Sequence, residues 1–321
     1  MSASLRTFAL AVLAATAVAS VAFAQPQAPP PPTVGQVTVT GRRPADEDMI
    51  RQVIAPFVAS HAARDRKSGL LLRAPPTGLC PATLGLPGAF DDFVTRRIIE
   101  VARQVGAAVE PQGKCQPNVE VLFTAQPQII IDTLAERTHG EILGFHFVGE
   151  KAPLIRVTRP IQAWYITGTT GDSSSQDKRL DPEGTVSSDH AHVRVDRAYG
   201  GGLDTGTGSL VPPRNHSQFV NVLILADAGK VAGREIGPIA DYVALLALSQ
   251  AQTLDACGAL PSILDLMASG CTSRPAPQAL TDSDLAFLKA LYATDLSASS
   301  GAARTQVAHE MAKDIAAPPK P

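Results

Sequence analysis

His190 and His192, with one residue between them, are the clearest candidate metal ligands in this 321-residue sequence. They lie in or beside a predicted strand at 191–196, where alternate side chains point to the same face. Neutral imidazole is a common zinc ligand; Asp189 and Asp196 lie nearby in the sequence, and His216 or His146 would have to complete the site. One interpretation is therefore a metal-dependent hydrolase or peptidase with zinc held by relocated ligands. The other is an exposed polar strand face beside a loop, which we favour because no spacing fixes a third ligand.

The four cysteines are the second set of residues with chemical potential: Cys80, Cys115, Cys257 and Cys271. Their even number and wide separation are typical of disulfides in an oxidising compartment, whereas zinc-binding cysteines usually include a C-x-x-C pair, which this sequence lacks. Of the possible connectivities we expect the nearest neighbours to pair, Cys80 with Cys115 and Cys257 with Cys271. Each bridge would stabilise the fold by about 3–4 kcal/mol in the chain-entropy model.

Composition and charge exclude several classes of protein. The 28 basic and 30 acidic residues give a formal net charge of −2, so the chain lacks the positive field typical of nucleic-acid-binding proteins. With 45% hydrophobic residues, the central part of the chain can bury a sizeable core. After the N-terminal segment no run approaches the ~18 consecutive apolar residues of a transmembrane helix. We therefore expect no membrane span in the mature chain.

The N-terminal segment has the features of a secretory signal peptide. Arg6 supplies a positive start, an apolar stretch rich in Ala and Val follows, and Ala22-Phe23-Ala24 fits the small-residue cleavage rule. We expect a cleaved signal peptide (1–24), a Pro-rich linker (25–45), a single domain (46–300), and a terminal helix with a disordered tail (301–321). The mature protein would be periplasmic or secreted.

Residues 37–43, Val-Thr-Val-Thr-Gly-Arg-Arg, resemble the TonB-box stretch of bacterial outer-membrane receptors. Such a segment could add as an edge strand to the sheet of an envelope partner. The alternatives, a first strand of the domain or a solvated linker, are favoured because short motifs are weak signals.

The central part of the sequence predicts alternating helices and strands. Apolar residues at helical spacing predict helices over 90–105 and 126–143, and Pro56 should kink or divide a helix over 46–63. β-Branched and aromatic residues predict strands at 119–124, 153–158, 162–168, 191–196 and 219–226, with a polar loop at 169–189. Because the strands come first and the helices last, we expect an α+β fold with a mixed β-sheet and packed helices.

The C-terminal third contains a helix that is apolar nearly all round. Residues 239–250 read IADYVALLALSQ, so this helix should be buried. A turn with Ser262-Ile263-Leu264-Asp265 follows, and Leu280-Thr281-Asp282-Ser283-Asp284-Leu285 then opens a further helix that runs to Leu291-Tyr292. The spacing of Thr281 and Asp284 is typical of a capping box.

This order of helix, turn and helix resembles the catalytic-domain end of the metzincin metallopeptidases. In that family a buried helix carries H-E-x-x-H-x-x-G-x-x-H, a Ser-Ile-Met turn lies below the metal, and a last helix begins L-[ST]-x-x-D and ends in Leu-Tyr. The sequence is closer still to an uncharacterised family of secreted bacterial proteins with the same ending. The resemblance implies a metzincin-like C-terminal helical part over about residues 218–296, and only the last helix matches residue by residue.

The zinc motif itself is degenerate in this sequence. In the register that the resemblance implies, Ala240 and Ala244 replace the first two histidines, Asp241 the glutamate, Ala247 the glycine, Gln250 the third histidine and Leu264 the methionine. Zinc needs three lone-pair donors and a base that activates its water, and alanine supplies neither. We therefore expect no catalytic, cofactor-binding or metal-binding residue in this helix. The expected function is a pseudopeptidase-like binding or scaffold protein that acts on an unidentified periplasmic or envelope protein.

Overall fold

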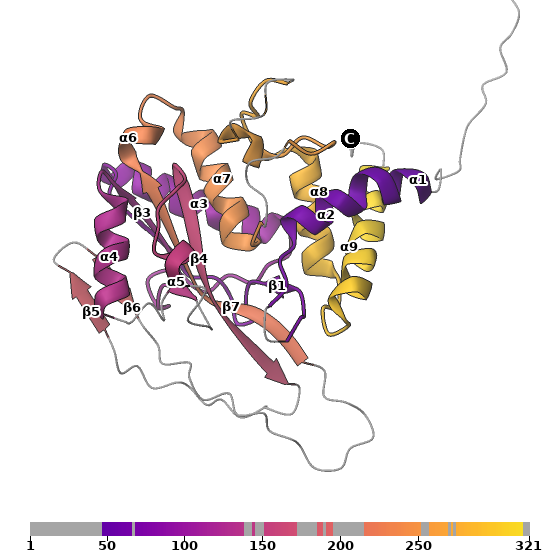
Figure 1. Ribbon diagram of the computed structural model, residues 1–321, viewed down its shortest axis with the longest axis horizontal. Coiled ribbons are helices and arrows are strands. Elements are labelled where there is room, and N and C mark those ends of the chain that lie inside the picture. The colour runs from indigo at the N-terminus through magenta and orange to yellow at the C-terminus, as the bar shows by residue number, and fades with distance from the viewer. Residues whose placement is uncertain are drawn as a thin grey trace, which may run out of the picture. The chain divides into compact units, whose positions relative to one another are not determined.

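The computed structural model describes residues 47–65, 68–137, 143–144, 151–171, 185–188, 191–194, 215–251, 257–268, 271 and 274–316 (Figure 1). All of them lie in the unit Arg42–Pro321. The predicted signal peptide, the linker, the segment 37–43 and the tail after Ala316 lie outside the described residues.

Five strands form the central sheet. β1 and β3 pair with successive parts of one edge of β7, β2 pairs with β3, and β4 pairs with the other edge of β7. The strands are β1 (Leu72–Arg73), β2 (Pro81–Leu84), β3 (Val119–Thr124), β4 (Ile161–Gly171) and β7 (Asn215–Asp227). β4 runs antiparallel to β7, and the other pairs are parallel. Strands β5 (Thr185–Ser188) and β6 (Ala191–Arg194) form a separate antiparallel pair. The predicted α+β fold with a mixed sheet is confirmed, and the sheet is mostly parallel.

β7 is the central strand, as its apolar sequence predicts. Its residues Val222 and Ile224 join a large core cluster on one face of the sheet, and Leu223 and Leu225 join a smaller cluster on the other. Successive side chains of a strand point to opposite faces, so a strand covered on both sides needs apolar residues at nearly every position. A bulge in the pairing with β4 falls at Ile166.

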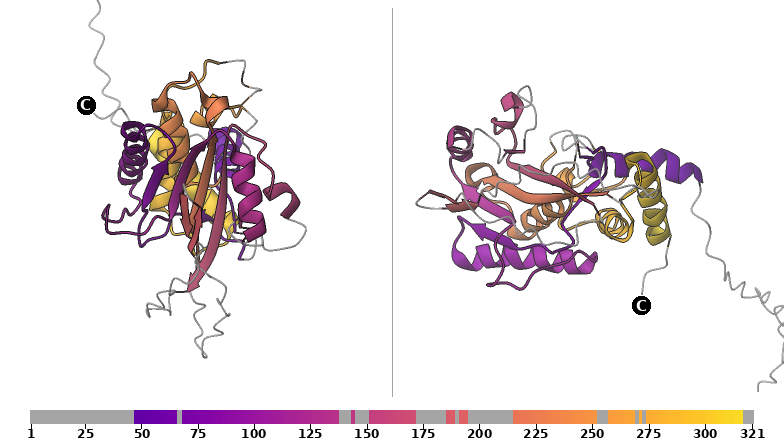
Figure 2. Two further views of the ribbon diagram at one scale, coloured as in Figure 1. Left: turned by 90° about the vertical axis from the view of Figure 1, so that its left-hand side faces the viewer. Right: turned by 90° about the horizontal axis from the view of Figure 1, so that it is seen from below.

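Helices cover both faces of this sheet (Figures 1 and 2). On the face of the large cluster lie α3 (Gly88–Gln104) and α7 (Ile236–Leu248), which follows the short α6 (Ala228–Val231). On the other face lie α4 (Pro127–Arg137) and α5 (Lys151–Leu154). There Trp164 of β4 is buried beside Ile131, and its indole N–H donates to the Leu154 carbonyl at 2.7 Å.

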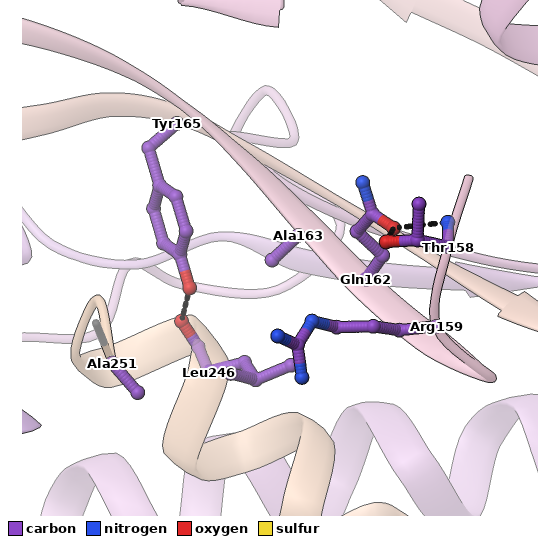
Figure 3. Close-up of a pocket in the computed structure, with 7 residues that line it drawn as sticks. All are labelled: Thr158, Arg159, Gln162, Ala163, Tyr165, Leu246 and Ala251. Atoms are coloured by element: carbon purple, nitrogen blue, oxygen red, sulfur yellow. Dashed lines mark hydrogen bonds between the residues drawn. The ribbon is translucent and has the colours of Figure 1, made fainter. Parts of the chain in front are cut away.

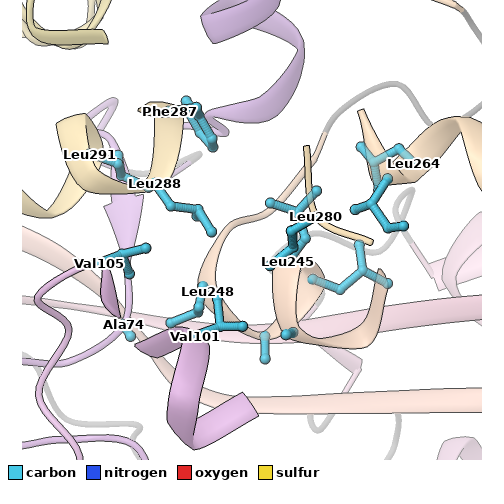
Figure 4. Close-up of a cluster of buried hydrophobic side chains, with 14 of the residues drawn as sticks. Ala74, Val101, Val105, Leu245, Leu248, Leu264, Leu280, Phe287, Leu288 and Leu291 are labelled. Carbon is cyan, nitrogen blue, oxygen red and sulfur yellow. The ribbon is translucent and has the colours of Figure 1, made fainter. Parts of the chain in front are cut away.

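The first and the last described helices lie side by side. The first helix, α1 (Glu47–Met49), continues into the π-helix η1 (Ile50–Ile54) and α2 (Ala55–His61). Both η1 and α2 pack on α9 (Ser300–Ile315), which also packs on α8 (Asp282–Ala293) (Figure 1). The 3₁₀ turn η4 (Ile263–Leu266) contacts α7. Leucines of α7 and α8 meet valines of α3 in one buried cluster (Figure 4).

The N-terminal helix, which we expect to be kinked or divided at Pro56, continues through it. Residues 47–61 are helical without a gap, and the helix changes from the π-helix η1 to α2 one residue before Pro56, so the proline marks a change of helix type.

Two predicted elements are wrong. Residues 153–158 are not a strand, because the chain forms α5 and then a turn. Leu154, Ile155 and Val157 are apolar because they pack against the smaller cluster, and a short apolar run does not distinguish a strand from a buried helical turn. The loop predicted at 169–189 is also wrong in part, since β4 continues to Gly171 and β5 occupies 185–188.

Both expected disulfides are present, Cys80–Cys115 and Cys257–Cys271, and no cysteine is free. The first bridge ties the start of β2 to the segment before β3, and the second ties the segment after α7 to the one after η4. Disulfides of this kind are typical of oxidising compartments. Within the described ranges, no helix is both long enough and apolar enough to cross a membrane.

Candidate functional site

In the register that the resemblance implies, the positions from Ala240 to Ala247 lie on α7, in the core of the molecule. Ala240, Ala244 and Ala247 have no exposed surface, so their methyl groups are enclosed by packed neighbours. The helix ends at Leu248, between the glycine position Ala247 and the third-ligand position Gln250. The main-chain carbonyl of Gln250 accepts a hydrogen bond from the Ala63 N–H at 3.1 Å, so the segment after α2 covers the chain where it leaves α7.

Asp241, which the resemblance implies at the position of the catalytic acid, is bound on both carboxylate oxygens. Its Oδ1 accepts from Nε of Arg97 on α3, and its Oδ2 accepts from Nη2 of the same guanidinium at 3.3 Å and from the Leu280 N–H at 2.8 Å. The hydrogen bond to Asp241 raises the pKa of Arg97, which keeps the guanidinium charged. The carboxylate is only 3% exposed, so it joins α3 and the entry to α8 and is not placed to reach a water at the surface.

The residues present at α7 do not fit a catalytic zinc ion. Two of the three ligand positions are alanines without a lone pair, and the acid that would activate water is held by Arg97 and Leu280. We therefore derive no reaction step through zinc at this helix.

A buried polar network joins η4 to α8, just beyond α7. The Ser262 hydroxyl donates to Oδ1 of Asp284 at 2.7 Å, and the Ile263 N–H donates to Oδ2 at 2.8 Å. Both turns are closed by capping boxes, Ser262 with Asp265 and Thr281 with Asp284, and the second confirms the predicted spacing. Burial raises the pKa of Asp284, and the hydrogen bonds that it accepts lower it.

His61, at the end of α2, completes this network from the N-terminal side. Its Nε2 lies 3.1 Å from the Ser262 hydroxyl, its Nδ1 lies 2.9 Å from the Ser60 hydroxyl, and its ring stacks on Phe57 at 3.8 Å. The Ser60 hydroxyl donates to the Phe57 carbonyl at 2.8 Å, and Nδ1 of His61 lies 2.9 Å from the same carbonyl, so the ring is held on both of its nitrogens. Burial lowers the pKa of His61 to about 4. This serine, histidine and aspartate are 3%, 6% and 0% exposed, so the network is closed to substrates.

A small pocket of about 190 Å³ opens between β4 and the C-terminal end of α7 (Figure 3). It is lined by Thr158, Arg159, Gln162, Ala163, Tyr165, Leu246 and Ala251. The Tyr165 hydroxyl donates to the Leu246 carbonyl at 2.9 Å, and the Gln162 carboxamide accepts from the Thr158 N–H at 2.9 Å. Burial raises the pKa of Tyr165, so its hydroxyl stays neutral. The polar wall is thus held in place, and Arg159 adds a positive charge.

The structure does not bring the histidine candidates into a described metal site. His190 lies outside the described residues, whereas His192 lies on β6, opposite Ser187 of β5. His216 lies on β7, in the other sheet.

Cys257, Asp265 and Cys271 have ligand atoms within 4.8 Å of one another. Both sulfur atoms belong to the disulfide, so neither offers a thiolate, and Arg274 pairs with Asp265 at 3.0 Å. The cluster is therefore satisfied without a metal.

Sequence reasoning did not find Arg97, His61 or the pocket. Arg97 and Asp241 are 144 residues apart and His61 and Ser262 are 201 apart, so no local spacing signals either contact. The capping pattern of Thr281 and Asp284 was the one signal in the sequence for the polar network.

Comparison of the chain with protein-family models, with curated proteins and with solved structures finds no match.

Proposed function

We propose that this protein is an exported, non-catalytic binding protein with a metzincin-like core whose zinc site has been lost. The observation that carries the proposal is the burial of α7 and the contacts that its side chains make. Ala240 and Ala244 are fully buried, and both carboxylate oxygens of Asp241 are occupied by Arg97 and Leu280. A helix with these contacts serves as a core element, and its chemistry offers neither a ligand nor a base.

Two further observations support the metzincin-like core. α7 ends between the glycine and third-ligand positions of the motif, where the chain of such a peptidase must turn away from its helix. The Ser262 turn and the acid of the last motif, Asp284, are 22 residues apart in sequence and joined by a hydrogen bond. The two motifs that the sequence analysis singled out therefore form one unit beside α7.

The pocket between β4 and α7 is the surface that we assign to binding. Its volume of about 190 Å³ is below the ~300 Å³ of a typical small-molecule site, so it suits one side chain or chain end of a larger partner. Arg159 already has a contact within the chain, but its guanidinium has five N–H groups, so the remaining ones can bind a carboxylate of an acidic side chain or a C-terminus. The predicted signal peptide and the disulfides support a partner in the periplasm or envelope.

Selection from a random peptide display library tests the binding function. We expect the wild-type chain to enrich peptides that carry an acidic residue or a free C-terminus, and Arg159→Glu to lose them. Arg156→Glu is the matched control, because Arg156 is exposed nearby but does not line the pocket. Equal enrichment by wild type and Arg159→Glu would remove the pocket from the proposal.

A hydrolysis assay on unstructured peptides, with zinc added, tests the non-catalytic part. We expect no turnover by the wild-type chain. Turnover that disappears in Asp241→Asn would make α7 a catalytic helix and overturn the proposal.

A further inference from the structure

Two arginines from distant parts of the chain come together beside the end of α2. Nη2 of Arg304, on α9, donates to the carbonyl of Ala62 at 2.7 Å, which places its guanidinium two residues from Arg64. The main chain of Arg64 forms an isolated antiparallel β-bridge with Leu71, so the chain is extended there. Its neighbours Ala63 and Asp65 are buried, and the Arg64 side chain is exposed on the opposite side. Two causes lower the pKa of Arg304. The larger is burial, and the second is repulsion by the positive charge of Arg64, which therefore lies close to it.

The neighbouring acid does not neutralise this pair. Asp65 is 4% exposed, and its carboxylate is turned inward, where it accepts from the Ser68 N–H at 2.7 Å and from the Thr167 hydroxyl at 2.7 Å. Within the part of the chain that the structure describes, neither guanidinium forms an ion pair with a carboxylate.

Arg304 also carries a donor with no acceptor. Its Nε is buried and has no hydrogen-bond partner. A buried donor that is left unpaired costs more than an ordinary hydrogen bond contributes, and more still in a charged group, so such donors are rare in native proteins. Nε has almost no exposed surface, so an anion from solvent reaches it only if the side chain moves, but an anion at the partly exposed guanidinium reduces the repulsion between the two arginines without such a movement.

We propose that Arg64 and Arg304 form an anion-binding site that takes a phosphate group. A phosphate monoester or inorganic phosphate carries close to two negative charges at pH 7, which matches two guanidinium groups, whereas a carboxylate carries one. Its oxygens accept paired hydrogen bonds from the planar fork of an arginine. The phosphate comes either free in solution or on the head group of a lipid. This site is separate from the pocket assigned to binding above.

Isothermal titration of the purified chain with inorganic phosphate, at constant ionic strength, tests the first source. We expect binding that weakens at least about tenfold in Arg64→Gln, because hydrogen bonds to a charged group are lost, and less in Arg64→Lys, which keeps the charge. Arg64 makes no side-chain contact that the fold needs, so the variant should remain folded. Arg96→Gln removes an exposed arginine of α3 and should bind as the wild type does.

Sedimentation with phosphatidylcholine vesicles, with and without phosphatidic acid, tests the second source. Binding to inorganic phosphate or to the phosphatidic acid vesicles, lost in Arg64→Gln and kept in Arg96→Gln, supports the site and identifies the source. Absence of binding in both assays, or binding by Arg64→Gln equal to that of the wild type, would overturn it.

Discussion

At the scale of single residues, the buried acids of the C-terminal third act as structural anchors, and Asp241 is the clearest case. Asp241→Asn would keep an acceptor for the Leu280 N–H but leave Arg97 with only the exposed Glu100 carboxylate, 3.4 Å away, as counter-charge. We expect the free energy of unfolding, measured with urea, to fall by about 2 kcal/mol, since Arg97 is partly exposed and solvent replaces some of the lost interaction. Asp92→Asn, on the exposed surface of α3, should change it by less than about 0.5 kcal/mol. Equal effects would show that the ion pair adds no stability.

His61 gives the protein a defined sensitivity to acid. Its pKa is about 4 in the folded chain and near its ordinary 6.5 when unfolded, so between these values the unfolded chain binds the extra proton. The free energy of unfolding should therefore fall as the pH drops from about 6.5 to 4, by up to about 3 kcal/mol, and this group should have no effect above that range.

Urea unfolding of the wild type and His61→Gln across this pH range checks the prediction. The raised pKa of Asp284 acts in the opposite direction at acid pH, and because Asp284 contacts His61 through Ser262, an Asp284→Asn variant measured alongside separates its contribution from that of His61. His309→Gln, on the partly exposed face of α9, should keep the wild-type pH dependence. Parallel curves for wild type and His61→Gln would mean that His61 is not buried in its neutral form.

At the scale of elements, the junction of η4 with α8 depends on one carboxylate. Asp284→Ala would remove a capping box and the acceptor of the Ser262 hydroxyl and the Ile263 N–H. We expect a loss of about 3 kcal/mol in the free energy of unfolding. Asp282→Ala, in the same first turn but exposed, should cost less than about 1 kcal/mol. A similar loss in both variants would reduce the role of Asp284 to an ordinary charge at a helix start.

The second disulfide holds the segment that carries η4. Cys257 and Cys271 are 14 residues apart and Cys80 and Cys115 are 35 apart, so the chain-entropy model gives about 3 and about 4 kcal/mol. Replacing both cysteines of either pair by serine should lower the free energy of unfolding by about these amounts, with the larger loss at Cys80–Cys115. A reversed order would show that native contacts, and not loop length, set the effect.

The elements that could be predicted from the sequence are those with strong patterns. The helical spacing of α3 and α8, the alternation in β3 and the unbroken apolar runs of β7 and α7 each gave the right type of element. β1 and β2 have two and four residues, too few for a pattern, and the apolar run at 153–158 fits a buried turn as well as a strand. The burial of α7 followed from its composition, but its partner Arg97 did not, because tertiary contacts leave no local signal.

At the scale of the whole molecule, the two ends of the described chain close over the end of α7. The segment from Phe57 to Ala63 contacts α8 through Phe287, the Ser262 turn through His61 and the exit of α7 through Gln250, and α9 packs behind it. The helix on which we propose a lost zinc site is thereby enclosed by N-terminal and C-terminal helices, which supports a structural role for it.

The most direct test of the central claim is the metal content of the purified mature protein, measured by elemental analysis after dialysis. The absence of ligands on α7 predicts zinc near zero. About one retained zinc per chain would contradict the claim, and loss of that zinc in a His190→Ala, His192→Ala variant would locate the metal at the two histidines.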